Sequence, residues 1–414
     1  MLDKNHMLRV VAVMHGLGFG GAQIATLEFI NLLSNRIMFK ILTCEEAVAQ
    51  IVNSLKNNVN VDVYKVPCSV VMGYPVMSIE GMKKLIDWAD VVWITDIEYS
   101  VASSIKRIRK VPVVAHVHSY ALICPWWGAS YRFSETCLEG CSAWRFISCK
   151  QGVNIEFGKI SILDSFRARA YWLMDFVKGP MDYVRWRGLM GNAIDDIDYF
   201  IAVSNATKEI ILAHLPEVKG RIGVLYNVIA QRPWRYVLAF PDEPGDYVLY
   251  ASGANPVKGP HILLNALKIL LNEGIDIRLY MTGASNSWLE GLARRLGVEW
   301  QVKFLGRLPD AEYFSMMAKA KVTVLPSIWP EPFGLVAAES ISLGVPVVGS
   351  NRGGIPEIVG NYGITTDPTP EEVAKAISTI IEQRFDKHEM RRYAAQKFGE
   401  GNAEKFLQIL SSVK

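Results

Sequence analysis

One stretch constrains the fold of this chain more than any other: residues 322–349 carry two short apolar runs separated by a loop and a helical segment. The runs are VTVLP (322–326) and VPVVG (345–349), and each is apolar on both of its faces. Such runs are typical of strands buried inside a parallel sheet. Gly344 is placed to end the helix between them. The stretch therefore predicts a β-α-β unit.

Two glutamates in this unit are eight positions apart: Glu331 in the loop and Glu339 about two turns into the helix. A helix rises ~1.5 Å per residue, which puts them roughly 12 Å apart along the axis, farther than the about 5–9.5 Å of a glycosidase pair. We expect them to bind two ends of a long, hydroxyl-rich ligand. The amides of Phe333, Gly334 and Leu335 suit an anion between them. These features indicate a nucleotide-sugar; alternatively, Glu331 caps the helix and Glu339 faces solvent.

The segment EPFGLVAAES, followed by GVPVVGSNRGGIPEIV, closely resembles the donor-binding signature of family-4 retaining glycosyltransferases with the GT-B fold. The family pattern is Glu, seven residues, Glu, and then a Gly-Gly-x-Pro-Glu turn, and all of it is present. The resemblance implies that Glu331 binds the hexose hydroxyls, that Glu339 binds the ribose hydroxyls and that Gly354 belongs to the donor site. It is densest over 250–360 and weakest over 125–200.

The 414 residues are enough for two domains of ordinary size. Strands alternate with helical segments from residue 8 onward, which predicts parallel, doubly wound sheets. Together with the resemblance, this gives an α/β protein of GT-B type, with two Rossmann-like domains facing a cleft. We expect an acceptor-binding domain over 1–228, a nucleotide-sugar-binding domain over 240–395, and a C-terminal helix over 396–414 that returns to the first domain.

The first predicted strand, at 8–16, leads into a glycine-rich loop. Gly16, Gly18 and Gly21 satisfy the G-x-G-x-x-G pattern of dinucleotide-binding folds, with Glu45 or Glu46 near the distance of a ribose-binding acid. The alternative is that the amides of Gly20 and Gly21 approach a phosphate or a sugar in the cleft. Family-4 enzymes have a similar Gly-Gly-Ala start to the first helix, which favours the second interpretation.

His118 follows the predicted strand at 111–119, at the end where open α/β sheets place ligands. The segment HSYALICP (118–125) resembles the family's His-Asp-Tyr-Trp-Leu-x-Cys-Pro segment, which implies that His118 reaches the donor sugar. Ser119 replaces the usual Asp. A structural role at the strand end is the alternative.

Lys258 lies near the start of the first helix of the second domain, where an ammonium group would hold a diphosphate. The family carries an Arg five positions earlier, and this chain has Gly253 there. Arg307 or Arg352 could supply the missing charge. We also expect the loop at 305–307 to border the nucleotide base.

Residues 124–149 hold four of the six cysteines: Cys124, Cys137, Cys141 and Cys149. Their spacing does not match a zinc ribbon, but four thiols in a short irregular segment could share one structural metal or form disulfides. An insertion over 124–150 with incidental thiols is the alternative. The next segment, 161–187, mixes basic and aromatic residues. It predicts either a helix that lies in a membrane interface or a pair of helices packed within the protein. The acidic residues in the segment favour the packed pair.

Composition excludes several classes. The net charge of +3 gives no sign of a nucleic-acid binder, and the N-terminal apolar run is too short for a signal peptide. We expect a cytoplasmic protein whose weak positive charge would tolerate contact with the inner membrane face. The predicted function is metal-independent, retaining transfer of a hexose from a UDP- or GDP-type sugar to a glycan, lipid or polyol hydroxyl, with no cofactor required. Alternatives are a non-catalytic GT-B subunit and, less favoured, an NAD-dependent oxidoreductase.

Overall fold

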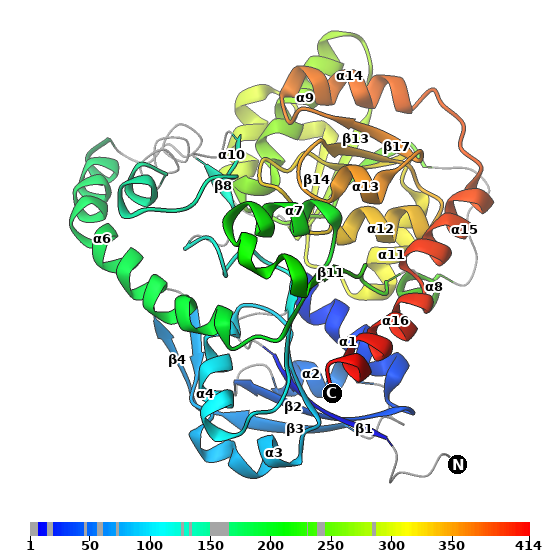
Figure 1. Cartoon of the computed structure of the whole chain (residues 1–414). Helices are drawn as coiled ribbons and strands as arrows, with labels where there is room; N and C mark the ends of the chain where they lie inside the picture. Colours follow the sequence, from blue (N-terminus) through cyan, green and yellow to red (C-terminus); the bar gives the residue numbers. More distant parts are fainter. Residues whose placement is uncertain are drawn as a thin grey trace.

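The computed structural model of the chain describes residues 7–14, 20–44, 48–55, 61–71, 74–125, 128–131, 135–149, 165–229, 231–237, 245–283 and 287–414. Its two domains are each built around a parallel sheet (Figure 1). This architecture confirms the predicted pair of Rossmann-like α/β domains. Gly16, Gly18, Glu45 and Glu46 lie outside the described residues, so the dinucleotide pattern has no structural account here.

The N-terminal sheet has seven strands in the order β11-β10-β7-β6-β1-β2-β3. Strand β1 pairs in parallel with β2 and β6, which puts Val10 opposite both Phe39 and Val91. The strands are β1 (Leu8–Val13), β2 (Ile37–Cys44), β3 (Val61–Val66), β6 (Val91–Ile94), β7 (Val113–Val117), β10 (Tyr199–Ala202) and β11 (Ile222–Val224).

The C-terminal sheet has six strands in the order β14-β13-β12-β15-β16-β17. Its strands are β12 (Tyr247–Tyr250), β13 (Arg278–Thr282), β14 (Val302–Gly306), β15 (Val322–Leu325), β16 (Val347–Ser350) and β17 (Gly363–Thr366). β15 and β16 pair in parallel and are joined through helix α12 (Leu335–Ser342). The stretch that constrained the fold most in the sequence therefore forms the predicted β-α-β unit inside this sheet.

Helices flank both sheets, and two short hairpins extend the N-terminal domain. The N-terminal helices are α1 (Gly21–Leu33), α2 (Val48–Ser54), α3 (Lys83–Trp88), α4 (Val101–Ile108), α6 (Ser165–Asp195) and α7 (Asn205–His214). The other C-terminal helices are α9 (Pro260–Asn272), α10 (Ser287–Leu296), α11 (Asp310–Lys319), α13 (Ile355–Val359) and α14 (Pro370–Ile380). The hairpins pair β4 (Cys68–Val71) with β5 (Tyr74–Met77) and β8 (Ser130–Tyr131) with β9 (Glu135–Thr136).

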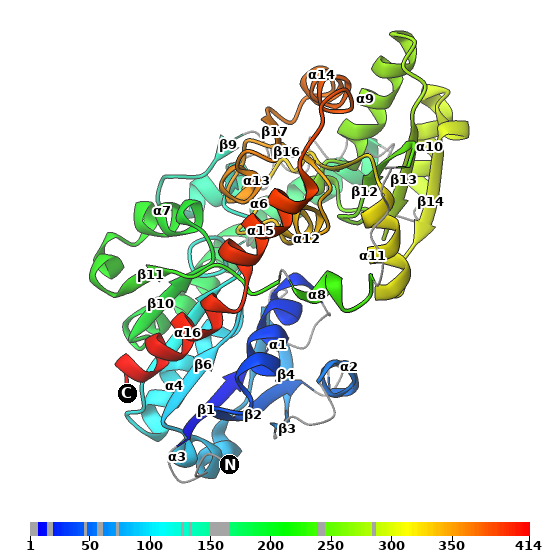
Figure 2. The same cartoon turned by 90° about the vertical axis from the view of Figure 1, so that its right-hand side faces the viewer.

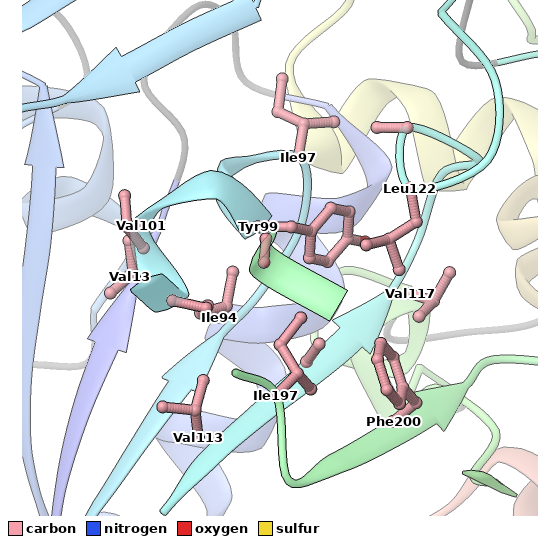
Figure 3. Packing of buried hydrophobic residues seen from close by; sticks show 14 of the residues in the cluster. Val13, Ile94, Ile97, Tyr99, Val101, Val113, Val117, Leu122, Ile197 and Phe200 are labelled. Carbon is pink, nitrogen blue, oxygen red and sulfur yellow. The ribbon is translucent and has the colours of Figure 1, made fainter. Parts of the chain in front are cut away.

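Each face of the N-terminal sheet has its own hydrophobic core. Val11 and Val13 of β1 point to one core, and the alternating Val10 and Ala12 point to the other. Figure 3 shows the first of these cores, with the ring of Tyr99 lying among aliphatic side chains of neighbouring elements. Burial on both faces explains why the strands read as continuous apolar runs.

The chain crosses between the domains twice. The first crossing contains the short helix α8 (Gln231–Trp234), and the second runs from α15 (Lys387–Phe398) to α16 (Gly401–Ser412) (Figure 2). α16 packs against α1, and its Phe406 is fully buried with ring centroids 4.9 Å from Phe29 and 4.6 Å from Trp93. A helix near residue 400 therefore completes the core of the first domain.

The structure contains a disulfide between Cys44 and Cys68, which the sequence did not lead us to expect. It joins the end of β2 to the start of β4. The four cysteines of the predicted insertion remain thiols and line, with His214, a cavity of about 20 Å³. Within the described residues, no group of His, Cys, Asp or Glu side chains is arranged to hold a metal ion.

The basic and aromatic segment at 161–187 does not form the expected helix pair. From residue 165 it belongs to the single 31-residue helix α6, which contains Pro180. Trp186 is buried and donates a hydrogen bond to the carbonyl of Ala121, whereas Met181 and Val184 are exposed. No helix among the described residues combines the length and apolar character needed to cross a bilayer.

Candidate functional site

A cavity of about 500 Å³ lies between the two domains. Its volume is within the usual range for small-molecule sites. The residues that line it are Gly20, Gly21, Ala22, Gln23, Asp96, His118, Ser119, Val203 and Asn227 from the N-terminal domain, and Ser252, Lys258, Leu325, Trp329, Glu331, Pro332, Phe333, Gly334, Leu335 and Val336 from the C-terminal domain. Most of the residues that the sequence singled out are thus brought together here.

Glycines shape the loop that carries Glu331. Gly334 is the N-cap residue of α12 and has φ of 95°, a backbone conformation that favours glycine. The amide of Gly354 donates a hydrogen bond of 2.7 Å to the carbonyl of Glu331. A Cβ atom on Gly353 would lie 2.3 Å from that same carbonyl oxygen. The Gly-Gly turn therefore holds the Glu331 loop by close backbone contact.

Glu331 is paired inside the cavity. Its Oε1 lies 2.6 Å from the Nζ atom of Lys258 and accepts a 2.9 Å hydrogen bond from Ser327. The same ammonium group lies 4.5 Å from the ring centroid of Trp329. Lys258 ends a 3₁₀ turn just before α9, and Gly259 follows in the left-handed conformation. A carboxylate and an ammonium group are therefore available together to a ligand with hydroxyl and phosphate groups.

Glu339 has different surroundings. Its side chain is 4 % exposed, with Oε1 2.5 Å from Nη1 of Arg232 and Oε2 accepting a 2.9 Å hydrogen bond from Tyr313. Arg232 comes from the crossing helix α8 and also pairs with Asp310 at 2.8 Å. Burial raises the pKa of Glu339, and Arg232 and Tyr313 oppose that rise. Glu339 does not line the cavity, so a ligand would reach it only after one of these contacts opens.

The Glu331 loop is also bound to the N-terminal domain. The carbonyl of Pro332 accepts hydrogen bonds from Ser204 at 2.5 Å and from Thr207 at 2.9 Å. Glu357, the last residue of the motif, accepts hydrogen bonds from the side chain of Asn205 at 2.8 Å and from a backbone amide in the first turn of α7. The motif therefore contributes to the domain interface as well as to the cavity.

The N-terminal wall of the cavity contains Gly20, Gly21 and His118, all predicted from the sequence. Gly20 precedes α1 and donates a 3.0 Å hydrogen bond to Gln23. A Cβ atom on Gly21 would come within 3.1 Å of the Leu335 side chain across the interface. Burial lowers the pKa of His118 to about 3, so this imidazole is neutral at physiological pH.

The positions predicted to replace the missing arginine lie elsewhere. Arg307 is exposed, and Arg352 lies 3.7 Å from Asp367; neither lines the cavity. Gly253, at the family's arginine position, has φ of 79°, where a side chain would strain the backbone. Lys258 is the one Lys or Arg among the described residues that line the cavity.

Sequence reasoning missed Asp96, Trp329 and Asn227, which also line the cavity. Asp96 had a usable signal, because it ends the predicted strand VVWITD at the edge where parallel sheets bind ligands. A larger hollow of about 1030 Å³ lies between α4 and α6. It contains the ion pair Lys106–Asp198 but none of the predicted site residues, so it is not the candidate site.

Part of the chain is similar in sequence to known glycosyltransferases. Residues 236–398 match the family described as "Glycosyl transferases group 1". An uncharacterized glycosyltransferase of Methanocaldococcus jannaschii is 28 % identical over 198 residues, covering 44 % of this chain and 50 % of that protein. A D-inositol 3-phosphate glycosyltransferase of Corynebacterium urealyticum is 34 % identical over 152 residues, covering 34 % of this chain and 36 % of that protein. The chain spans half or less of the length of these two relatives.

Solved structures match over nearly the whole chain. Anabaena HepE in complex with UDP has a TM-score of 0.64 and 20 % identity, covering 98 % of this chain and 100 % of that one. The pneumococcal O-GlcNAc transferase GtfA, in complex with UDP and GlcNAc, has a TM-score of 0.66 and 11 % identity, covering 99 % of both chains. At these identities the likeness shows the fold, which is GT-B. The family match at 236–398 includes all six strands of the C-terminal sheet.

Proposed function

We propose that this chain is a retaining glycosyltransferase that moves a hexose from a nucleoside-diphosphate sugar to a hydroxyl group of a glycan, a lipid-linked molecule or a small polyol. The observation that carries the proposal is the Glu331–Lys258 pair, 2.6 Å apart in a cavity lined by both domains. Several of the similar structures hold UDP or UDP-glucose, which favours a UDP-sugar as the donor.

Each wall of the cavity has a role in this proposal. Lys258 neutralises the diphosphate, and the amides at the start of α12 add uncharged donors. Glu331 accepts hydrogen bonds from the hexose hydroxyls, and neutral His118 binds the sugar from the opposite wall. Glu339 binds the ribose once Tyr313 or Arg232 releases one carboxylate oxygen, which couples donor binding to a local rearrangement.

The reaction breaks the bond between the anomeric carbon and the phosphate oxygen, and the phosphate leaves with the electron pair. The acceptor oxygen forms the new bond on the same face of the sugar, and its proton passes to the departing phosphate oxygen. Positive charge near the leaving phosphate is where stabilisation matters most. In this proposal Lys258 supplies that positive charge. The departing phosphate oxygen takes the acceptor proton, so no separate protein base is needed.

The test is to incubate the protein with UDP-, GDP- and ADP-sugars and with NAD, and to measure the thermal shift and the release of nucleotide. We expect a UDP-sugar to raise the melting temperature and to release UDP, with EDTA causing no loss. Glu331→Gln should reduce release roughly 100-fold or more, since the hexose loses a charged partner. Glu371→Gln, on an exposed part of α14, is the matched control and should act like the wild type.

One observation favours a second candidate, a non-catalytic GT-B subunit. Glycine at position 253 removes the family's arginine, and Lys258, the cavity's one Lys or Arg in the described chain, is already paired with Glu331. Such a subunit would show a thermal shift with UDP-sugars but no release. A thermal shift with NAD and none with any sugar nucleotide would contradict both candidates.

A further inference from the structure

Asp96 is a buried carboxyl group that the proposed donor site does not use. It follows β6, lines the interdomain cavity and is 7 % exposed. Its Oδ1 atom has no hydrogen-bond partner among the described residues. Buried polar atoms are nearly always hydrogen-bonded, because an unmet one costs the full loss of its hydration. An unmet carboxyl oxygen in a ligand cavity therefore indicates a missing ligand group.

The neighbours of Asp96 do not compensate a negative charge. Glu98, which is fully buried, belongs to the same turn and interacts with Asp96 unfavourably. His118 lines the same cavity but is neutral, since burial holds its pKa at about 3. Burial also raises the pKa of Asp96 to about 7, an effect that the Ser119 hydroxyl partly offsets. A group that donates a hydrogen bond to this carboxyl would lower the free-energy cost of burying it, whereas a second anion would raise that cost.

Among the described residues, the rest of the N-terminal wall carries no charged side chain, and it includes the polar side chains of Gln23, Ser119 and Asn227. Both polar atoms of the Asn227 side chain are buried without a partner in the described part of the chain. The one ammonium group on the cavity belongs to the opposite wall, where it is 2.6 Å from Glu331. A ligand that faces Asp96 thus meets hydrogen-bonding groups and no free cation.

We propose that Asp96 holds the acceptor hydroxyl, and that the acceptor group bound there is a neutral sugar or polyol rather than an anion. This inference rests on the proposed function and adds to it the chemical class of the acceptor. The hydroxyl donates its hydrogen bond to the Asp96 carboxylate, which directs the oxygen lone pairs toward the anomeric carbon. When the new bond forms, the proton goes to the departing phosphate oxygen.

The test compares Asp96→Asn with wild type, using the UDP-sugar that shows the largest release. Transfer is measured to glucose and myo-inositol and, in parallel, to glucose 6-phosphate and myo-inositol 1-phosphate. We expect wild type to prefer the neutral acceptors. In Asp96→Asn, UDP affinity should stay within about twofold, while the KM for the neutral acceptor should rise roughly 10- to 100-fold, as for a lost hydrogen bond to a charged group.

Glu98→Gln is the matched control, because it neutralises a buried carboxyl in the same turn that does not line the cavity. It should leave the acceptor KM unchanged, and Asp96→Ser should repeat the asparagine result with a smaller side chain. An unchanged KM in both Asp96 variants, or a wild-type preference for the phosphate esters, overturns the inference alone. Failure of wild type to bind any UDP-sugar overturns the proposed function and this inference with it.

Discussion

The two walls of the cavity differ in whether their carboxylates are paired with a cation. On the C-terminal wall and behind it, Glu331 and Glu339 each have a cation within 2.6 Å, which is Lys258 for Glu331 and Arg232 for Glu339. On the N-terminal wall, Asp96 has an oxygen with no partner in the described residues and a buried acid, Glu98, nearby. The two carboxylates on the first side are therefore stabilised by ion pairs, whereas the carboxyl on the second side is buried without a compensating cation.

This difference separates stability from function. A paired buried carboxylate cannot be removed without leaving its cation uncompensated, so its loss should weaken the fold. An unpaired buried carboxyl lowers stability while it is ionised, so its loss should strengthen the fold. The three predictions below test this contrast through the free energy of unfolding, measured by urea denaturation.

The largest effect is expected for Glu339→Ala. It leaves Arg232, whose side chain is 10 % exposed, with the half-exposed Asp310 as its remaining ion-pair partner among the described residues. We expect the free energy of unfolding to fall by about 2–4 kcal/mol. This is less than the roughly 3–5 kcal/mol that breaking a buried ion pair usually costs, because Asp310 remains paired with Arg232. Glu331→Ala is the comparison variant and should cost about 1 kcal/mol. Equal losses in the two variants would show that Glu339 is no more structural than Glu331.

Asp96→Asn should have an effect of opposite sign. The pKa of this carboxyl is about 7 in the folded protein against 3.8 ordinarily, so between these pH values the folded state binds more protons than the unfolded state. Stability from this group therefore falls as pH rises from about 4 to 7.

At pH 8 we expect Asp96→Asn to be more stable than wild type by roughly 1–3 kcal/mol, and at pH 4 the difference should vanish. In a site that excludes water, each unit of pKa difference would correspond to ~1.4 kcal/mol of stability. We expect a smaller gain here because water can enter the cavity. Urea titrations at both pH values measure it. A variant that is less stable than wild type at pH 8 would mean that Asp96 has a structural partner.

The smallest change in stability is expected for Lys258→Met. The lysine side chain is 26 % exposed, methionine preserves much of its apolar stem, and Glu331 keeps its hydrogen bond from Ser327, so the cost should be about 1 kcal/mol. Release of nucleotide should nevertheless fall roughly 100-fold or more, because the leaving diphosphate loses its cation. A large loss of stability with little loss of nucleotide release would show that the Lys258–Glu331 pair serves the fold and not the reaction.

Local sequence patterns were enough to predict the two sheets and the position of Glu331. Apolar runs separated by amphipathic segments identify parallel strands, and a proline-rich loop before α12 places Glu331 at the strand end. The surroundings of Glu339 were not predictable this way, because Arg232 is 107 residues and Tyr313 is 26 residues away in sequence. The Cys44–Cys68 disulfide joins elements 24 residues apart, with no spacing signature to reveal it.

Helix α16 has a consequence for how the protein acquires its structure during synthesis. The N-terminal domain emerges from the ribosome first, yet Phe406 and Leu410 fill its core between α1 and β6. Until that helix has been translated, Phe29 and Trp93 lack the Phe406 ring that packs against both of them in the finished domain. The domain that emerges first is thus the last to be completed, and the apolar surface left open in the interval is of the kind that promotes aggregation of folding intermediates.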